Sequence, residues 1–296
     1  MQQLRNIRAE TEDLGEFKGM KQRIITAAVL VLILFAALFF YYTPVFNVIV
    51  SIICMMASYE ILHAYGLLKN LPLSIVNFTF SALVPFFMTP VFSRYVMPIT
   101  FVYVLAQFIV VIANSKQVQV SQVSTMFFTT FVASFAFSTI AYMKVVHPQH
   151  SMFYCFIMFI AAWITDTGAY FTGRFFGKHK MAPYISPHKT WEGAVGGVLF
   201  STIGAVVAGF IYQAIAGFTG GGTVDINFLL LAATGLTASI IGELGDLSAS
   251  CIKRQCGIKD FGSIMPGHGG ILDRFDSLMF VAPYVFLVVK YFPIAA

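Results

Sequence analysis

The chain has 296 residues, of which 58% are hydrophobic and only 10% are charged, with a formal net charge of +5 at pH 7. Soluble domains carry about 25% charged residues, so this chain has too little polar surface to cover itself in water. The composition excludes an intrinsically disordered protein, a collagen-like fibre and a disulfide-rich secreted scaffold. It is typical of a protein that crosses a membrane several times.

Apolar runs of about 20 residues, the length that crosses a bilayer, recur along the chain after a polar tail at residues 1–22. They predict about nine transmembrane helices, near residues 24–42, 45–63, 73–91, 96–114, 124–146, 152–173, 193–215, 228–251 and 277–292. The Gly-rich seventh run and the short ninth run leave eight or ten helices open. The first run follows Lys21 and Arg23 as in a signal peptide, but no small-residue cleavage site follows it, so we expect it to be retained.

The expected fold is therefore an all-α polytopic membrane protein in three parts. Residues 1–22 form the tail, 23–150 the N-terminal transmembrane helices and 151–296 the C-terminal transmembrane helices. The last part contains two polar loops, 174–192 and 252–276, which carry the candidate catalytic residues.

The distribution of Lys and Arg predicts the orientation of these helices. With the N-terminus in the cytoplasm, nine spans put 15 of these residues on the cytoplasmic side and three outside, as the positive-inside rule requires. We therefore expect a multi-pass protein of the inner (cytoplasmic) membrane with its polar catalytic site on the cytoplasmic side. No basic stripe interleaved with aromatic residues indicates a nucleic-acid groove, so we expect no nucleic-acid partner.

The charged residues are concentrated in a few places. Residues 1–23 hold nine of the 31, seven are scattered, and 15 lie at Asp166, in residues 174–192 and in residues 243–276. A carboxylate in hydrocarbon costs at least a few kcal/mol, so acids inside or near spans are candidates for function.

One face of the eighth predicted helix is polar. Glu243, Asp246, Ser250 and Lys253 recur every three or four residues and so share that face. The alternative interpretation is an ion-paired helix end, with Lys253 and Arg254 extending to the headgroups.

The following segment, rich in Pro and Gly, ends with Asp273 and Asp276, where the last helix should begin. Acids in a first helical turn also stabilise the helix dipole, which is the alternative to a ligand role. Together with Asp246 they are the hard oxygen ligands that Mg²⁺ takes alongside phosphate oxygens. The cations that suit phosphate groups are Lys253, Arg254, Lys259 and Arg274. The segment indicates a site for a metal-bound polyphosphate at a membrane surface.

The loop 174–192 repeats this pattern with four cations and two histidines. Plain positive-inside charge is the alternative, but such a loop requires only Lys or Arg. The run Ser186-Pro187-His188-Lys189-Thr190-Trp191-Glu192 sets a Pro, a Trp and a Glu among hydroxyl groups, which favours a functional loop.

A long spaced motif resembles the signature of the phosphatidate cytidylyltransferase (CDP-diacylglycerol synthase) family. It reads Ser250-x-Ile252-Lys253-Arg254-x4-Lys259-Asp260-x-Gly262-x3-Pro266-x-His268-Gly269-Gly270-Ile271-x-Asp273-Arg274-Phe275-Asp276. Met265 departs from it, because a branched or aromatic apolar residue is usual there. The run from Asp166 to Gly193 and the pair Gly245-Asp246 are also similar to this family, so the resemblance covers about residues 160–280.

The resemblance implies that CTP and phosphatidate react to give CDP-diacylglycerol and pyrophosphate. It implies a divalent cation, normally Mg²⁺, with a second cation compatible, and a homodimer in the lipid bilayer. We expect catalytic roles for Asp246, Lys253, Asp273, Arg274 and Asp276. We expect substrate contacts from Ser186, Lys189, Thr190, Ser250, Arg254, Lys259 and His268. We expect metal ligation by Asp166, Asp246, Asp273 and Asp276, although Asp166 could instead hold Lys189.

Two other functions are compatible with part of the pattern. A CTP-dependent polyprenol kinase would use the same nucleotide but needs a general base near the acceptor hydroxyl, and it would release CDP instead of pyrophosphate. A transporter would show matched halves with broken helices at mid-membrane, whereas here the polar residues gather on one side of the bilayer.

Overall fold

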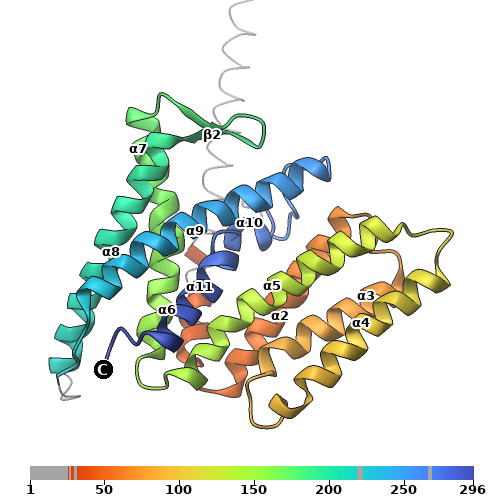
Figure 1. The fold of residues 1–296 in the computed structure, drawn as a ribbon, viewed down its shortest axis with the longest axis horizontal. Coiled ribbons are helices and arrows are strands. Elements are labelled where there is room, and N and C mark those ends of the chain that lie inside the picture. The colour runs from red at the N-terminus through yellow and green to blue at the C-terminus, as the bar shows by residue number, and fades with distance from the viewer. Residues whose placement is uncertain (1–25, 27, 30–31, 219–222, 266–268) are drawn as a thin grey trace, which may run out of the picture.

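The computed structural model describes residues 26, 28–29, 32–218, 223–265 and 269–296, and these are mostly helical (Figure 1). In chain order the helices are α2 (Pro44–Ala64), α3 (Leu71–Leu83), α4 (Val96–Ala113), α5 (Val120–Val146), α6 (Ser151–Phe159), α7 (Thr165–Phe176), α8 (Trp191–Phe218), α9 (Phe228–Gln255), α10 (Leu272–Phe275) and α11 (Leu278–Tyr291). A π-helical turn at Ile160–Ile164 joins α6 to α7. Short 3-10 turns lie at Val84–Phe86 and Ser93–Tyr95.

Six of the described helical segments are long and apolar enough to cross a membrane. They are Pro44–Ala64, Ser93–Ala113, Val120–Val146, Ser151–Phe176, Trp191–Phe218 and Phe228–Gln255, and two shorter apolar helices are Leu71–Phe86 and Leu278–Tyr291. These eight coincide with the second to ninth predicted spans. The first predicted span lies partly outside the described residues, and its residues 32–39 are helical. The chain is thus a helical membrane protein, and the count of nine spans stays a prediction.

The loop 174–192 departs from the all-α expectation, because it contains an antiparallel β-hairpin. Strand β1 (Lys180–Ala182) pairs with β2 (Ser186–Thr190), with Lys180 opposite Thr190 and Ala182 opposite Ser186. The loop 174–192 contains Pro187, and proline is disfavoured inside a helix. The hairpin instead provides hydrogen-bond partners for the backbone amide and carbonyl groups of this loop.

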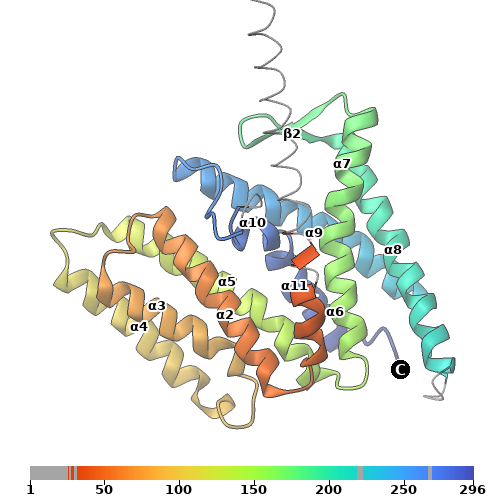
Figure 2. The same cartoon turned by 180° about the vertical axis from the view of Figure 1, so that it is seen from behind.

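The helices form two groups (Figures 1 and 2). Helices α2 to α5 pack together in one group, and α6 to α9 form the other. Helix α11 lies between the groups and packs against both α5 and α9. The short α10, just before α11, is therefore held at the junction of the two groups.

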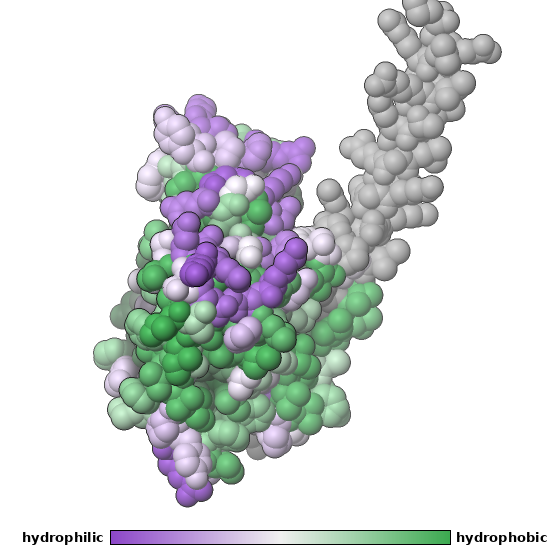
Figure 3. All heavy atoms as spheres, turned by 90° about the vertical axis from the view of Figure 1, so that its right-hand side faces the viewer, coloured by the Kyte–Doolittle hydropathy of each residue, from purple (hydrophilic) through white to green (hydrophobic). Residues whose placement is uncertain are grey.

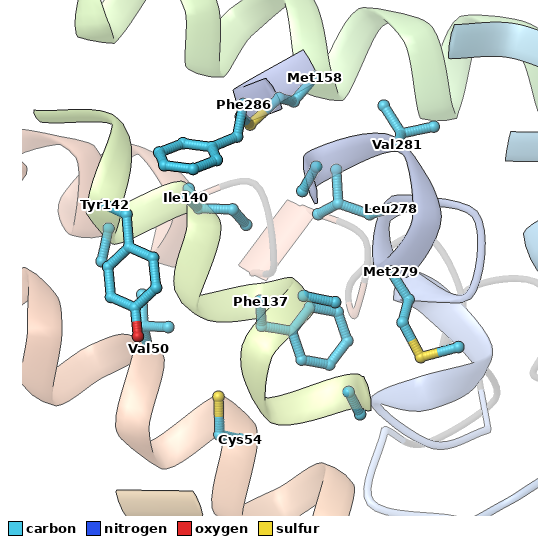
Figure 4. Packing of buried hydrophobic residues seen from close by; sticks show 14 of the residues in the cluster. Val50, Cys54, Phe137, Ile140, Tyr142, Met158, Leu278, Met279, Val281 and Phe286 are labelled. Atoms are coloured by element: carbon cyan, nitrogen blue, oxygen red, sulfur yellow. The ribbon is translucent and has the colours of Figure 1, made fainter. Parts of the chain in front are cut away.

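Buried apolar side chains join the two groups (Figure 4). Phe137 and Ile140 of α5 lie close to Leu278 of α11, with Val50 of α2 and Met158 of α6 in the same cluster. Because these side chains have almost no exposed area, burial and close packing hold the junction together.

Two helix ends next to the candidate site share one geometry. After α2, Gly66 has a φ of 70°, and after α9, Gly257 has a φ of 68°, values that glycine adopts without strain. The amide of Leu67 donates to the Leu62 carbonyl, and that of Ile258 donates to the Lys253 carbonyl, which closes a Schellman-type cap at each end. The cap after α9 turns the chain back toward the site.

Helices α7 and α8 approach each other through glycines. A Cβ at Gly197 of α8 would lie 2.7 Å from the Thr165 carbonyl oxygen of α7 and 3.1 Å from the Ala169 Cβ. Small residues of this kind let helix backbones approach closely in membranes. The close approach of α7 to α8 places α7 beside the β1–β2 hairpin, which follows α7 in the chain.

The surface of the protein divides by polarity (Figure 3). Hydrophilic residues gather at the end that carries the hairpin, and a broad hydrophobic zone lies below them. The hydrophobic zone is the surface expected to face lipid tails, since apolar faces of this size are rare on soluble monomers.

We expect Gly197→Ala to destabilise the packing of α7 on α8 by about 1–3 kcal/mol, because the added methyl group meets backbone that cannot move freely. The matched control is Gly217→Ala in the same helix, where a Cβ would meet nothing within 4 Å. Thermal unfolding in detergent should show a lower melting temperature for the first variant and an unchanged or higher one for the second. Equal melting temperatures would contradict this account of the interface.

Candidate active site

Helix α9 carries the polar face that the spacing predicted. Glu243 is buried, Asp246 is half-buried, and Ser250 Oγ donates a hydrogen bond of 3.3 Å to Asp246 Oδ1. Lys253 follows on the same face and is buried. The prediction that these four residues share one face of a helix is confirmed.

Lys189 of strand β2 joins the hairpin to this face. Its Nζ lies 2.5 Å from Glu243 Oε2 and 2.7 Å from Asp246 Oδ2. Burial alone would lower the pKa of Lys189, but the two carboxylates outweigh it and raise the pKa above its usual value. Glu243 is therefore ion-paired, and its partner is Lys189 of the hairpin.

A polar cavity of about 500 Å³ opens between the hairpin, α7, α8 and α9. The predicted site residues that line it are Asp166, Ser186, Lys189, Thr190 and Asp246, together with Glu243. Glu243 Oε1 is buried there, and no hydrogen-bond partner for it occurs among the described residues. A buried carboxylate oxygen with no donor is costly, so Lys189, which pairs with the other oxygen, is the main compensation for burying Glu243.

The walls of this cavity are held by side chains at the base of the hairpin. Glu192 accepts hydrogen bonds from the amides of Lys178 (3.1 Å) and His179 (3.2 Å), and its Oε1 lies 2.6 Å from His179 Nδ1. Thr190 Oγ1 accepts the amide of Gly193 at 3.2 Å, at the start of α8. These contacts fix where β2 ends and thus where Lys189 points.

Asp273 organises the segment between α9 and α10. Its Oδ1 accepts a hydrogen bond of 2.8 Å from Lys253 Nζ, and its Oδ2 accepts the amides of Phe261 (2.8 Å) and Gly270 (3.0 Å). The carboxylate is buried, and these three donors occupy both oxygens. In this arrangement Asp273 positions Lys253, and its predicted role as a direct metal ligand stays a prediction.

Asp276 and Asp166 lie on either side of Ser277. The Ser277 amide donates to Asp276 Oδ1 at 2.8 Å, and its hydroxyl lies 3.4 Å from both carboxylate oxygens of Asp166. Burial, with the nearby carboxylates of Asp246 and Asp166, raises the pKa of Asp276 above its usual range. Three predicted acids, from α7, from α9 and from the end of α10, are thus close enough to interact.

A second cavity, of about 460 Å³, lies on the other side of α9 and is mainly apolar. Asp276 is among its lining residues, and the apolar residues around it include Phe128, Val132, Ala249, Ile252 and Met279. Asp246 thus lines the polar cavity, and Asp276 lines the apolar one.

The remaining predicted residues lie at the margin. Arg254 is exposed and donates to the Ile185 carbonyl at 3.3 Å, which ties the end of α9 to the hairpin. Lys259 and Arg274 are exposed and line neither of the two cavities described above. His268 lies outside the described residues.

Glu60 of α2 is a residue that the sequence analysis missed, because it was counted among the scattered charges. It is fully buried and accepts the amides of Ile271 at 2.8 Å and Leu272 at 2.9 Å. The signal that would have found Glu60 is that it is a lone acid inside an apolar span. Such an acid needs hydrogen-bond donors from elsewhere in the chain.

The acids of the site offer oxygen donors for a metal ion. Within the described part of the chain, no three Asp, Glu, His or Cys side chains already converge on one metal position. By donor type, however, Asp166, Asp246 and Asp276 fit a hard divalent cation, since they offer only carboxylate oxygens. Asp166 and Asp246 also face the same cavity.

Comparison with known proteins identifies the family. The profile of the cytidylyltransferase family matches residues 21–292, and the chain belongs to this family. The phosphatidate cytidylyltransferase of Staphylococcus haemolyticus is 43% identical over 157 residues, which are 51% of this chain and 56% of that protein. The Bacillus subtilis protein of that name is 42% identical over 144 residues (49% and 50%), and the Haemophilus influenzae one is 44% identical over 138 residues (46% and 46%). The chain spans about half the length of the curated relatives it matches.

We expect Lys189→Met to destabilise the protein by about 2–3 kcal/mol, at the low end for a buried ion pair because the Lys189 side chain is 18% exposed. The physical reason is that Glu243 and Asp246 lose their shared cation. The control Lys180→Met removes an exposed cation from the same hairpin. Thermal unfolding in detergent should separate the two variants, and adding Glu243→Gln to Lys189→Met should recover part of the loss. Equal melting temperatures for both single variants would rule out a structural role for this ion pair.

Proposed function

We propose that this protein transfers the cytidylyl group of CTP to phosphatidate, giving CDP-diacylglycerol and pyrophosphate. The observation that carries the proposal is the pair of cavities at α9, one polar and lined by Asp246, the other apolar and lined by Asp276. A water-soluble polyphosphate suits the first, and a lipid suits the second. Membership of the cytidylyltransferase family and the names of the relatives support the same reaction.

The chemistry requires charge neutralisation more than an activated nucleophile. The phosphate of phosphatidate is already an anion, so one of its oxygens attacks the α-phosphorus of CTP in line. A new phosphorus–oxygen bond forms as the bond to the β-phosphate oxygen breaks, and pyrophosphate leaves with that electron pair. The main barrier is bringing two polyanions together, which cations placed in advance lower.

The residues of this chain divide that task by position. Lys189 faces the polar cavity and can release Glu243 or Asp246 to contact a phosphate oxygen. Ser186 and Thr190 line the same cavity and offer hydroxyl donors. Lys253 is held by Asp273, and we assign it to stabilising charge on the leaving pyrophosphate. Ser250 orients Asp246, and Arg254, Lys259, Arg274 and His268 stay predicted phosphate contacts.

We propose Mg²⁺ or another divalent cation as the cofactor, with Asp166, Asp246 and Asp276 as the residues that would hold it. When bound, such a cation neutralises phosphate charge and orients the reacting groups. Asp273 is kept as a predicted ligand as well, although its present partners are Lys253 and two backbone amides.

We further propose that the hairpin end faces the cytoplasm, with the N-terminus on the same side and nine spans in an inner membrane. The 15-to-three distribution of Lys and Arg supports this orientation. The gathering of hydrophilic surface at the hairpin end, above a hydrophobic zone, is consistent with it. The homodimer stays a prediction.

The reaction is tested with purified protein, phosphatidate and CTP labelled in either the α- or the γ-phosphate, with Mg²⁺ or with EDTA. We expect α-label to enter the lipid, γ-label to appear in pyrophosphate, and both to require the divalent cation. Label from the γ-phosphate in the lipid would mean a kinase and would overturn the proposal, as would the absence of lipid label.

Asp246→Asn should lower kcat/KM by about 100-fold or more, because a proposed ligand of the divalent cation and a partner of Lys189 loses its charge while the side chain keeps its shape. The control is Asp225→Asn, an exposed acid in the segment before α9. Both variants should be compared for melting temperature, so that loss of activity is separated from unfolding. Activity of Asp246→Asn within a few-fold of the unmodified protein would remove Asp246 from the site.

Val132→Trp should raise the KM for phosphatidate and leave the KM for CTP unchanged, because the indole would fill part of the apolar cavity that Val132 lines. Val120→Trp makes the same change on an exposed position of the same helix and should alter neither constant. A parallel rise in both KM values would contradict the assignment of the apolar cavity to the lipid.

A further inference from the structure

Glu60 joins two parts of the chain that are far apart in sequence. It belongs to α2, whereas its partners Ile271 and Leu272 lie more than 200 positions later, directly before Asp273. Each carboxylate oxygen takes one backbone amide, Oε1 from Ile271 and Oε2 from Leu272. The contact therefore ties the N-terminal group of helices to the segment that carries Asp273 and Asp276.

The chain around Glu60 is shaped to receive it. A Cβ at Gly262 would lie 2.7 Å from Glu60 Oε1, and a Cβ at Gly270 would overlap the same carboxylate. Both positions thus need glycine because the carboxylate occupies the space of a side chain. Glu60 is thus contacted at both Gly262 and Gly270.

Two carboxylates share the amides of this segment. Asp273 accepts hydrogen bonds from the amides of Phe261 and Gly270. Glu60 accepts hydrogen bonds from the next two amides along the chain, those of Ile271 and Leu272. Hydrogen bonds to a charged acceptor contribute about 1.5–3 kcal/mol each, enough to offset part of the cost of burying an acid. Three consecutive amides are therefore fixed by two anions from different helices.

This arrangement controls where the reacting groups lie. Asp273, one residue after Leu272, holds Lys253 at 2.8 Å, and Asp276 follows one helical turn later. A shift of the segment would move both Lys253 and Asp276. Displacements of about 1 Å at a catalytic site cost up to 100-fold in rate, so an anchor of this kind matters for turnover even where folding survives its loss.

We propose that Glu60 is a positioning residue for the cytidylyl transfer, acting through the backbone amides of Ile271 and Leu272. Only the expected effect on kcat rests on the proposed function, whereas the contacts of Glu60 do not depend on it. Glu60 itself contacts the segment and lines neither of the two cavities described above, so its effect is on the placement of Lys253 and Asp276.

The first test is kinetic. Glu60→Gln keeps the size of the side chain but sets an amide donor against one of the two backbone donors. We expect kcat to fall about 10- to 100-fold with the KM values for CTP and phosphatidate changed less than threefold. The control Asn77→Ala removes another fully buried polar side chain from the same group of helices, one that accepts from Tyr103 and Gln107. It should lower the melting temperature without this loss of kcat.

The second test is a double-mutant cycle with Gly262→Ala. Alone, this change should reduce kcat because the new methyl group displaces the Glu60 carboxylate. Combined with Glu60→Ala, it should cost almost nothing further, since the carboxylate that it displaces is gone. Additive losses would overturn the proposed packing of the segment around Glu60.

The third test does not depend on the reaction. Hydrogen exchange should be faster in peptides covering residues 269–276 of Glu60→Ala than in the unmodified protein, and unchanged there in Asn77→Ala. If the unmodified protein forms no CDP-diacylglycerol but exchange still rises, the proposed function fails while the anchor stands. Unchanged exchange, or a kcat of Glu60→Gln within twofold of normal, would overturn the positioning role.

Discussion

A carboxylate inside an apolar helical bundle needs a cation or backbone donors, and this requirement assembles the site. Glu243 and Asp246 share Lys189, which brings the hairpin to α9. Asp273 accepts hydrogen bonds from Lys253 and two backbone amides, and Glu60 accepts hydrogen bonds from two other backbone amides. Because each of these acids has at least one donor in another segment, satisfying these groups holds four separate parts of the chain in one arrangement.

The resulting geometry suits a reaction between partners of opposite solubility. Helix α9 separates a polar cavity from an apolar one. Asp246, which lines the first, is close enough to raise the pKa of Asp276, which lines the second. In the proposed reaction, the nucleotide would enter the polar cavity and the lipid the apolar one. The same separation explains why the charges of the chain are gathered in a few segments.

Helices were predictable because the length of an apolar run is a local property. Eight predicted spans coincide with helices, and the shared face of Asp246, Ser250 and Lys253 follows from helical periodicity alone. The hairpin at 180–190 was expected only as a loop, since strand pairing of so short a segment depends on its flanking helices. Glu60 was missed because its partners are over 200 residues away.

The sequence alone therefore determined the class of protein, the approximate positions of the spans and the residue types available for phosphate and metal chemistry. Tertiary structure decided which residue meets which. It paired Lys189 with Glu243 and Asp246, and Lys253 with Asp273, where helix spacing had suggested an ion-paired end for α9. Local sequence sets burial cost and periodicity, but the donor that offsets a buried charge is chosen by long-range packing, which spacing along the chain does not encode.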